Sequence, residues 1–317
     1  MPPLIQQRVR TLSVIEANAA TLWAADAQPC DTLPPQIARL LDASVTGFTV
    51  SRVLEAGVTA DAAVFALEYA GVVDGPTSIV LKYAKIMEAS RELAQSASMY
   101  EKEVTFYTEL YDEVSKVVPV PKLYGTFVDP DKPKEYFCIA MEDLTEHSHP
   151  LEQVAGVSAK LLGEIGQSVA KLHATYWEHP MLKEDLYSGG DANVCRPWWS
   201  NWLDTMFADS ECIDRMWKIF KNGVGLENTC IDVMPDKDMR AMVRLWKEHG
   251  RAMSDEMTKV LSSRPKTLLH GDLRSDNLFQ SHAADGFTII DWHTLAAGPP
   301  GLELVQFLSG SLGDIAE

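Results

Sequence analysis

The sequence predicts an α+β protein in which a strand-rich part is followed by a longer, mostly helical part. Between residues 45 and 141, short runs alternate apolar and polar residues, which is typical of strands with one buried face. From residue 151 onward, apolar residues recur at the spacing of one helix face. We therefore expect a lead-in at 1–44, a strand-rich domain at 45–141 and a helical domain at 142–317. The helical stripe comprises Leu161, Ile165, Val169, Leu172 and Tyr176.

The charge and the cysteine content limit the kinds of binding partner and the cellular location that we expect. The chain has 317 residues, with 28 Lys and Arg against 45 Asp and Glu, so its net charge is −17. An acidic surface repels nucleic acid and anionic membranes, so neither is expected as a partner, whereas a cationic substrate would be tolerated. The five cysteines are scattered and contain no Cys-x-x-Cys pair, which argues against a disulfide framework or a zinc site and favours a cytoplasmic location. The sequence contains no visible signal peptide or membrane-spanning run, and it leaves the oligomeric state open.

The lead-in at 1–44 is alanine-rich and is expected to be helical, with a break at Pro34-Pro35. After it, predicted strands at 48–54 and 64–69 flank a loop that contains Gly57. This loop is either an ordinary hairpin connection or a cover for nucleotide phosphates that uses its backbone N–H groups. The residues themselves leave both interpretations open.

Lys82 lies within an apolar run that predicts another strand, at 78–83. A buried ammonium group is costly unless it is paired, and the alternative is a side chain that extends along a sheet edge to water. The helix predicted at 100–110 offers a partner, because Glu103 shares its inward face with three apolar residues. We therefore expect Lys82 and Glu103 to form an ion pair.

The stretch that ends at Asp291 carries the densest set of chemically useful side chains. It contains the pattern His-x-Asp-x-x-x-x-Asn at His270, Asp272 and Asn277. Two short strands on either side of a turn signal at 285–286 predict a hairpin. Its open end would bring Asn277 and Asp291 together, and their oxygens suit a hard cation such as Mg²⁺.

Taken together, these residues are typical of phosphoryl transfer. In that chemistry an aspartate accepts the proton of the attacking hydroxyl, while an asparagine and a second aspartate hold magnesium ions. Any one of them alone is more often a cap or a turn former. We expect His270 to be structural and to bond backbone groups, and His173 to be a packed histidine. A metal-dependent hydrolase built on His270 and Asp272 is a weaker alternative, because it lacks a second histidine pair at ligand spacing.

Large aromatic side chains are concentrated between residues 176 and 221. They form either the core of the helical part or an apolar pocket that binds a ring-bearing substrate, and both interpretations remain open. The members are Tyr176, Trp177, Tyr187, Trp198, Trp199, Trp202, Phe207, Trp217 and Phe220.

These segments together resemble the aminoglycoside phosphotransferase/choline-kinase-like superfamily, and within it the ecdysteroid-kinase-like small-molecule kinases and their bacterial relatives. The matching segments occur in family order. They are 76–82, 100–107, 141–144, 171–174, 269–279 and 290–292. The resemblance implies a bilobal protein-kinase-like fold, with a small antiparallel-sheet N-lobe, a larger mostly helical C-lobe and ATP between them.

The resemblance also implies a role for each matching residue. Asp272 would be the catalytic base, and Asn277 and Asp291 would bind Mg²⁺. Lys82, held by Glu103, would contact the α- and β-phosphates of ATP. The remaining nucleotide-binding residues would be Gly57 in the loop and, through their backbone groups, Met141, Glu142 and Asp143 at the adenine.

The function expected on this basis is ATP-dependent phosphorylation of a hydroxyl group on a small molecule. The aromatic segment favours a ring-bearing alcohol such as a steroid or polyketide, and the acidic charge leaves an aminoglycoside-like amino sugar or a quaternary amine open. The alternative is a pseudokinase-like module that binds nucleotide without turnover. Ala60, His293 and Glu303 depart from residues common in relatives, which usually have glycine, glutamine and aspartate there. Relatives also continue with further C-terminal helices, so we expect a shortened or incomplete C-terminus.

Overall fold

The computed structural model describes residues 45–54, 59–71, 75–85, 87–128, 137–153, 155–188, 236–283 and 285–311. The predicted lead-in at 1–44, the loop position Gly57 and the part of the aromatic segment beyond residue 188 lie outside these ranges. The chain divides into two compact units, the first comprising Met1–Tyr176, His270–Leu295 and Gly301–Glu317 and the second Trp177–Leu269 and Ala296–Pro300. All described residues of the predicted site belong to the first unit, and the predicted lobe boundary after residue 141 stays a prediction.

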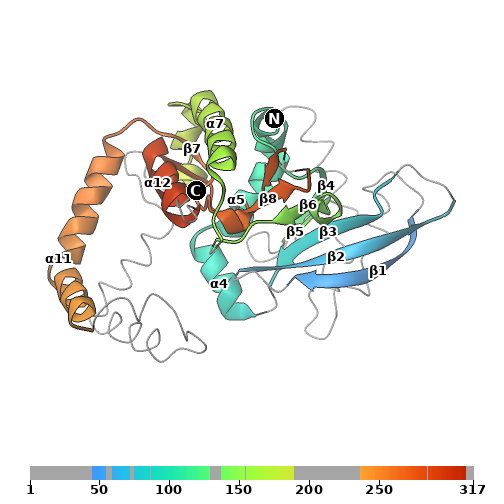
Figure 1. Ribbon diagram of the computed structural model, residues 1–317, viewed down its shortest axis with the longest axis horizontal. Helices are drawn as coiled ribbons and strands as arrows, with labels where there is room; N and C mark the ends of the chain where they lie inside the picture. Colours follow the sequence, from blue (N-terminus) through green and yellow to red (C-terminus); the bar gives the residue numbers. More distant parts are fainter. Residues whose placement is uncertain are drawn as a thin grey trace. The chain divides into compact units, whose positions relative to one another are not determined.

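A five-stranded antiparallel sheet forms the strand-rich part of the first unit, in the order β1-β2-β3-β5-β4. Figure 1 shows β1, β2 and β3 side by side as long arrows. The strands are β1 (Val45–Leu54), β2 (Ala60–Tyr69), β3 (Ser78–Ala84), β4 (Leu123–Val128) and β5 (Phe137–Glu142).

Side chains alternate between the two faces of this sheet along each strand, so the two faces carry different kinds of residue. On β3, Ile79 and Leu81 are fully buried and pack with Phe65 and Ala140 in one apolar cluster. Lys82 lies on the opposite face from these residues. The alternation predicted from the sequence therefore separates a packed core face from a face that carries the lysine.

The helix predicted at 100–110 is present, but it is not a uniform α-helix. It follows α4 (Glu88–Ser96) and consists of α5 (Met99–Thr105), a π-helical stretch η2 (Phe106–Leu110) and α6 (Tyr111–Val114). π-Helical turns occur mostly as short interruptions of α-helices and often lie at functional sites. The predicted inward face is confirmed. Its buried members are Glu103, Phe106, Tyr107 and Leu110.

The predicted hairpin is also present, as part of a three-stranded sheet with the order β6-β8-β9. Its strands are β6 (Ser148–Pro150), β8 (Leu278–Ser281) and β9 (Phe287–Ile289), and the short helices η3 (Leu144–Glu146) and η5 (Ser275–Asn277) precede β6 and β8. The unit also contains α7 (Ala159–Thr175), capped by Ser158, and most of α12 (Pro300–Ser311). The apolar stripe predicted on α7 is buried, and so is His173, as expected for a packed histidine.

The second unit contains a long helix and a two-stranded antiparallel sheet. Its helix α11 (Asp236–Ser262) is continuous and runs through Gly250. The sheet consists of β10 (Ala296–Gly298) and β7 (Thr267–Leu269). The other elements are η4 (Pro180–Lys183) and α8 (Asp185–Ser188). Within the described ranges, no helix is both long and apolar enough to span a bilayer.

Candidate active site

The lysine predicted to be buried in a strand is paired. Lys82 Nζ lies 2.6 Å from Glu103 Oε1, as predicted, and 2.5 Å from Asp291 Oδ1, a contact that the sequence did not indicate. Burial lowers the pKa of the Lys82 ammonium group, but Asp291 and Glu103 raise it by more, so that the pKa lies above its ordinary value. The alternative of a lysine that extends along a sheet edge to water is therefore wrong.

Asp291 stands in a strained loop directly after β9. Its φ of +69° lies in the left-handed region, which is unusual for a residue with a side chain and is often found at functional sites. Its Oδ1 atom accepts hydrogen bonds from Lys82 and from Nδ1 of His293. Burial raises the pKa of the Asp291 carboxyl group, but Lys82 and His293 lower it by a larger amount. The pKa therefore lies well below its ordinary value. Asp291 therefore remains a carboxylate.

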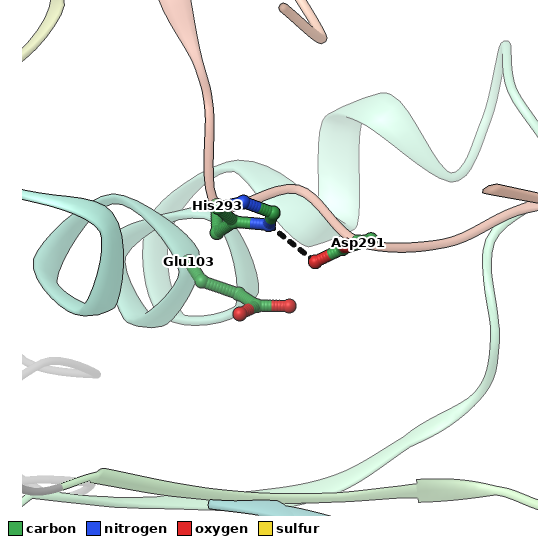
Figure 2. Close-up of side chains that lie close together, drawn as sticks. All are labelled: Glu103, Asp291 and His293. Atoms are coloured by element: carbon green, nitrogen blue, oxygen red, sulfur yellow. Dashed lines mark hydrogen bonds and ion pairs between the residues drawn. The ribbon is translucent and has the colours of Figure 1, made fainter. Parts of the chain in front are cut away.

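Glu103, Asp291 and His293 form a group whose ligand atoms lie within 4.8 Å of one another (Figure 2). Glu103 comes from α5, while the other two residues belong to the loop after β9. Such a group could hold a metal ion, but the Lys82 ammonium group already bonds to both of its carboxylates. We therefore assign these side chains to holding Lys82.

The turn before Asp272 can be made only by glycine. Gly271 has a φ of +87°, and a Cβ atom at this position would lie 2.1 Å from the carbonyl oxygen of Thr294. Next to it, His270 is fixed between two backbone groups. Its Nε2 donates to the Ile290 carbonyl at 2.9 Å, and its Nδ1 accepts the Asp272 N–H at 3.3 Å. Burial lowers the pKa of His270, so the ring is neutral, and the prediction of a structural histidine is confirmed.

The carboxylate of Asp272 accepts three side-chain hydrogen bonds. Asn277 Nδ2 donates to its Oδ2 at 3.0 Å, and Arg274 Nε donates to the same atom at 3.2 Å. Gln306 Nε2, from α12, donates to Oδ1 at 3.1 Å. Neither Arg274 nor Gln306 was predicted. Arg274 lies inside the motif, two positions after Asp272, and this closeness in sequence could have indicated the contact.

Asn277 and Asp291 meet at the open end of the hairpin, as predicted. Leu278 pairs with Ile289, and the Ile290 N–H donates to the Asn277 carbonyl at 3.0 Å. Asn277 Nδ2 is already bonded to Asp272, which leaves its Oδ1 as an acceptor. Among the described residues, neither Asn277 Oδ1 nor Asp291 Oδ2 accepts a hydrogen bond. Two available oxygen donors of this kind match the preference of a hard cation.

Glu303 connects three elements around the loop that carries Asp272. Its Oε1 accepts the Gly271 N–H at 2.9 Å, and its Oε2 lies 2.8 Å from Nε2 of His173 on α7. The side chain is completely buried. The glutamate that departs from the usual aspartate is therefore a structural anchor, and its place on α12 also positions Gln306 one turn later.

Trp292 joins the lysine-holding group to the same loop. Its ring is stacked on Phe106, with the centroids 4.2 Å apart and the planes 4° apart. On another side it contacts the ring of His270 edge to face, at 4.6 Å. Because Trp292 is fully buried, it packs the helix of Glu103, the loop of Asp291 and the loop of Asp272 into one rigid arrangement.

A cavity of about 460 Å³ borders these groups. Val80 and Met141 line it on the sheet side, and Lys82, Asn277 and Asp291 supply charged and polar atoms. The volume and the mixture of apolar wall with a few polar groups are typical of a small-ligand site. Asp272 does not line the cavity, although its partners Arg274 and Asn277 do.

The three residues predicted at the adenine differ in which of their polar groups are already hydrogen-bonded within the protein. The Glu142 N–H donates to the Lys122 carbonyl at 2.9 Å, so this donor is already used within the sheet edge. The Asp143 carboxylate accepts bonds from Thr145 and from Ser78 Oγ, and it caps η3. Met141 pairs with strands on both sides. All three line the cavity, and the side chain of Asp143 has a structural task.

The comparisons with known proteins agree with this chemistry. A model of the ecdysteroid kinase-like family matches residues 67–315. A search of curated proteins found no significant match.

Three solved structures are similar at low identity. An aminoglycoside phosphotransferase from Streptomyces rimosus is 16% identical with a TM-score of 0.37, over 82% of this chain and 76% of that one. A type I macrolide 2′-phosphotransferase is 15% identical with a TM-score of 0.40, over 86% and 74%. An ethanolamine kinase from Plasmodium vivax is 11% identical with a TM-score of 0.39, over 96% and 73%. At these values the family assignment rests on the family match alone.

That match agrees with the elements of the structure, and the α+β class predicted from the sequence is confirmed. It spans most of the chain and includes every described residue of the predicted site. The protein therefore belongs to the ecdysteroid kinase-like family, a family of kinases.

Proposed function

We propose that this protein transfers the γ-phosphate of ATP to a hydroxyl group of a small molecule. The observation that carries the proposal is the arrangement around one cavity of a paired lysine, Lys82, and the acidic and amide groups of Asp291 and Asn277. Asp272 is joined to this set by its hydrogen bond from Asn277. No single member is diagnostic, but together they are the groups that phosphoryl transfer requires.

The side chains fit a nucleotide with Mg²⁺. Asn277 Oδ1 and the Asp291 carboxylate would hold the metal, and the metal would neutralise charge on the phosphates. Lys82 is ionised and fixed by Glu103, so it presents a constant positive charge to the cavity. Electrostatic groups that are already in place need no reorganisation during the reaction, and this is a major source of catalysis.

In the proposed reaction Asp272 takes the proton of the substrate hydroxyl. The hydroxyl oxygen forms a bond to the γ-phosphorus, the bond from that phosphorus to the bridging β–γ oxygen breaks, and ADP leaves. Hydrogen bonds from Asn277 and Gln306 orient the carboxylate before substrate arrives. General-base assistance of this kind typically contributes about 10²–10⁴-fold to the rate.

For the substrate we propose a ring-bearing alcohol such as a steroid or polyketide, and an aminoglycoside-like amino sugar stays within the test. The family name supports a steroid alcohol. Two described members of the aromatic segment, Tyr176 and Tyr187, are buried, so they support the core interpretation for their own positions. The tryptophans at 198–202 and the later aromatics lie outside the described residues, so their part in a substrate pocket stays a prediction.

The test is ATP turnover with Mg²⁺ across sterols, macrolides, aminoglycosides and choline, for the wild type and Asp272→Asn. This substitution keeps the shape of the side chain and removes the base, although one of the two hydrogen-bonded oxygens becomes an NH2 group. We expect phosphate transfer to one class of alcohol, lowered about 10²–10⁴-fold in the variant. Tight ATP binding without transfer to any compound would favour the nucleotide-binding module, and absence of ATP binding would refute both.

A further inference from the structure

Arg274 lies between two carboxylates at the edge of the cavity. Its Nε donates to Asp272 Oδ2 at 3.2 Å, and its NH1 donates to Asp276 Oδ2 at 2.9 Å and to Gln153 Oε1 at 3.2 Å. The side chain is 38% exposed and lines the cavity together with Lys82, Asn277 and Asp291. Within the described part of the chain, NH2 has no hydrogen-bond partner. Arg274 is therefore a cation at the cavity with donors still available.

The contact with Asp272 conflicts with the chemistry proposed for that residue. Oδ2 accepts from both Arg274 and Asn277, and these two bonds occupy both lone pairs of that oxygen, so it cannot also accept a bond from a substrate hydroxyl. A pair that is this open to solvent is weak and easily exchanged. A phosphate offers the guanidinium group a better partner, because its oxygens match the planar fork of N–H donors in a bidentate bond.

We propose that Arg274 recognises the terminal phosphate of ATP and, in doing so, leaves Asp272. The guanidinium group exchanges its bond to Asp272 Oδ2 for bonds to the γ-phosphate, which frees that oxygen for the substrate hydroxyl. Asp276 and Gln153 hold NH1 near the cavity throughout the exchange. This role rests on the proposed function. It means that ATP binding frees Asp272 Oδ2 to accept the proton of the substrate hydroxyl.

The test compares the binding of ATP and ADP, because ADP lacks the phosphate in question. Dissociation constants are measured by calorimetry with Mg²⁺ for the full chain and for Arg274→Gln. We expect ATP affinity to fall about 10- to 100-fold, as for the loss of hydrogen bonds to a charged group, with ADP affinity within about twofold of wild type. A residue with only a structural role would change both affinities by the same factor.

Three further variants make the result specific. Arg274→Lys keeps a positive charge and should recover part of the preference for ATP. Asp276→Asn weakens the hold on NH1, while Gln153 still bonds to it, so this variant should lower the preference for ATP less than Arg274→Gln does. Arg52→Gln is the matched control, because Arg52 lines the same cavity and donates to Thr145, and it should change both affinities equally.

The outcomes separate this inference from the proposed function. Equal loss of ATP and ADP affinity in Arg274→Gln, or no loss of either, overturns the phosphate contact while wild-type transfer stands. The phosphate contact is also overturned if Asp276→Asn lowers the preference for ATP as much as Arg274→Gln does, since the arginine would then matter only as the partner of Asp276. A wild type that binds neither nucleotide removes the proposed function and this inference together.

Discussion

Two cations border the same cavity, each between two carboxylates, and they differ mainly in their access to solvent. Lys82 lies between Glu103 and Asp291, with side-chain exposures of 16%, 2% and 26%. Arg274 lies between Asp272 and Asp276, and the exposures are 38%, 15% and 41%. The first group comes from three distant segments of the chain, whereas the second lies within five consecutive residues.

The difference indicates how one site can be both rigid and adaptable. In the Lys82 group, burial strengthens the attraction between charges and makes separation of the ions costly, so the group holds one geometry. In the Arg274 group, water screens the charges and can replace each partner. Asp272, the residue proposed to meet the substrate, belongs to the exchangeable group, while Lys82 and Asp291 belong to the rigid one.

The largest effect on stability is expected for Lys82→Met. This substitution removes the ammonium group that bonds to both Glu103 and Asp291, and removing one partner of a buried ion pair typically costs about 3–5 kcal/mol. We expect the free energy of unfolding in urea to fall by that amount. Adding Glu103→Leu should recover part of the loss, because it removes one unpaired buried carboxylate. A loss below about 1 kcal/mol, the range of exposed pairs, would contradict the distinction between the two groups.

The next effect tests whether the Asp272 loop depends on its contact with the loop after Asp291. In Gly271→Ala the new Cβ would meet the Thr294 carbonyl oxygen in a backbone of positive φ. Strain of this kind costs about 1–3 kcal/mol, and displacement of the loop should also lower phosphate transfer. Gly286→Ala is the control, because its φ is +126° but nothing lies within 4 Å of the added atom. Unfolding and turnover measurements on both variants separate the clash from the strain, and equal effects would exclude a role for Thr294.

His270 should make the free energy of unfolding depend on pH, and we expect no such dependence from the exposed Arg274 group. Burial lowers the pKa of His270 in the folded state, so below its unfolded pKa the unfolded chain binds the additional proton. This stabilisation is complete above the unfolded pKa and is lost as the pH falls towards the folded pKa, at no more than about 1.4 kcal/mol per pH unit. Urea unfolding of the wild type and His270→Gln between pH 7 and 5 should show a smaller decline in the variant. If the free energy of unfolding declined equally with pH in the two proteins, His270 would not be the source of the pH dependence.

The smallest effect on stability is expected for Arg274→Met. Exposed ion pairs contribute about 0–1 kcal/mol, so the free energy of unfolding should change by no more than that. The change should shrink further at high salt, where exposed charges are screened. Thermal unfolding at low and high ionic strength measures both. A loss as large as that of Lys82→Met would show that the Arg274 group is not exchangeable.

Much of the site could be predicted because its chemistry is local. The spacing of Asp272 and Asn277 and the hairpin up to Asp291 depend on turn chemistry and strand alternation within about two dozen residues. The inward face of the helix that carries Glu103 follows from the helical period alone. The Lys82–Glu103 pair could be inferred because a buried lysine on one element and a buried carboxylate on another require partners.

Most of the contacts that were missed pair residues far apart in the sequence, and the bond from Arg274 to Asp272 is the local exception. Gln306 reaches Asp272 only because α12 packs beside the loop, and Glu303 holds Gly271 for the same reason. Similarly, the structural use of the Asp143 carboxylate depends on Ser78, which lies in another strand. No periodicity or motif in the sequence encodes these distances.

The sequence by itself determined which groups are present, the face on which each lies and the hairpin that brings Asn277 to Asp291. These features follow from backbone hydrogen bonding and side-chain period, which act over a few residues. Only the tertiary structure decided that Lys82 also bonds to Asp291, which oxygens remain free, and that one of two similar charge groups is buried while the other is open. The reason is that burial and electrostatic strength depend on all surrounding atoms, most of which come from distant parts of the chain.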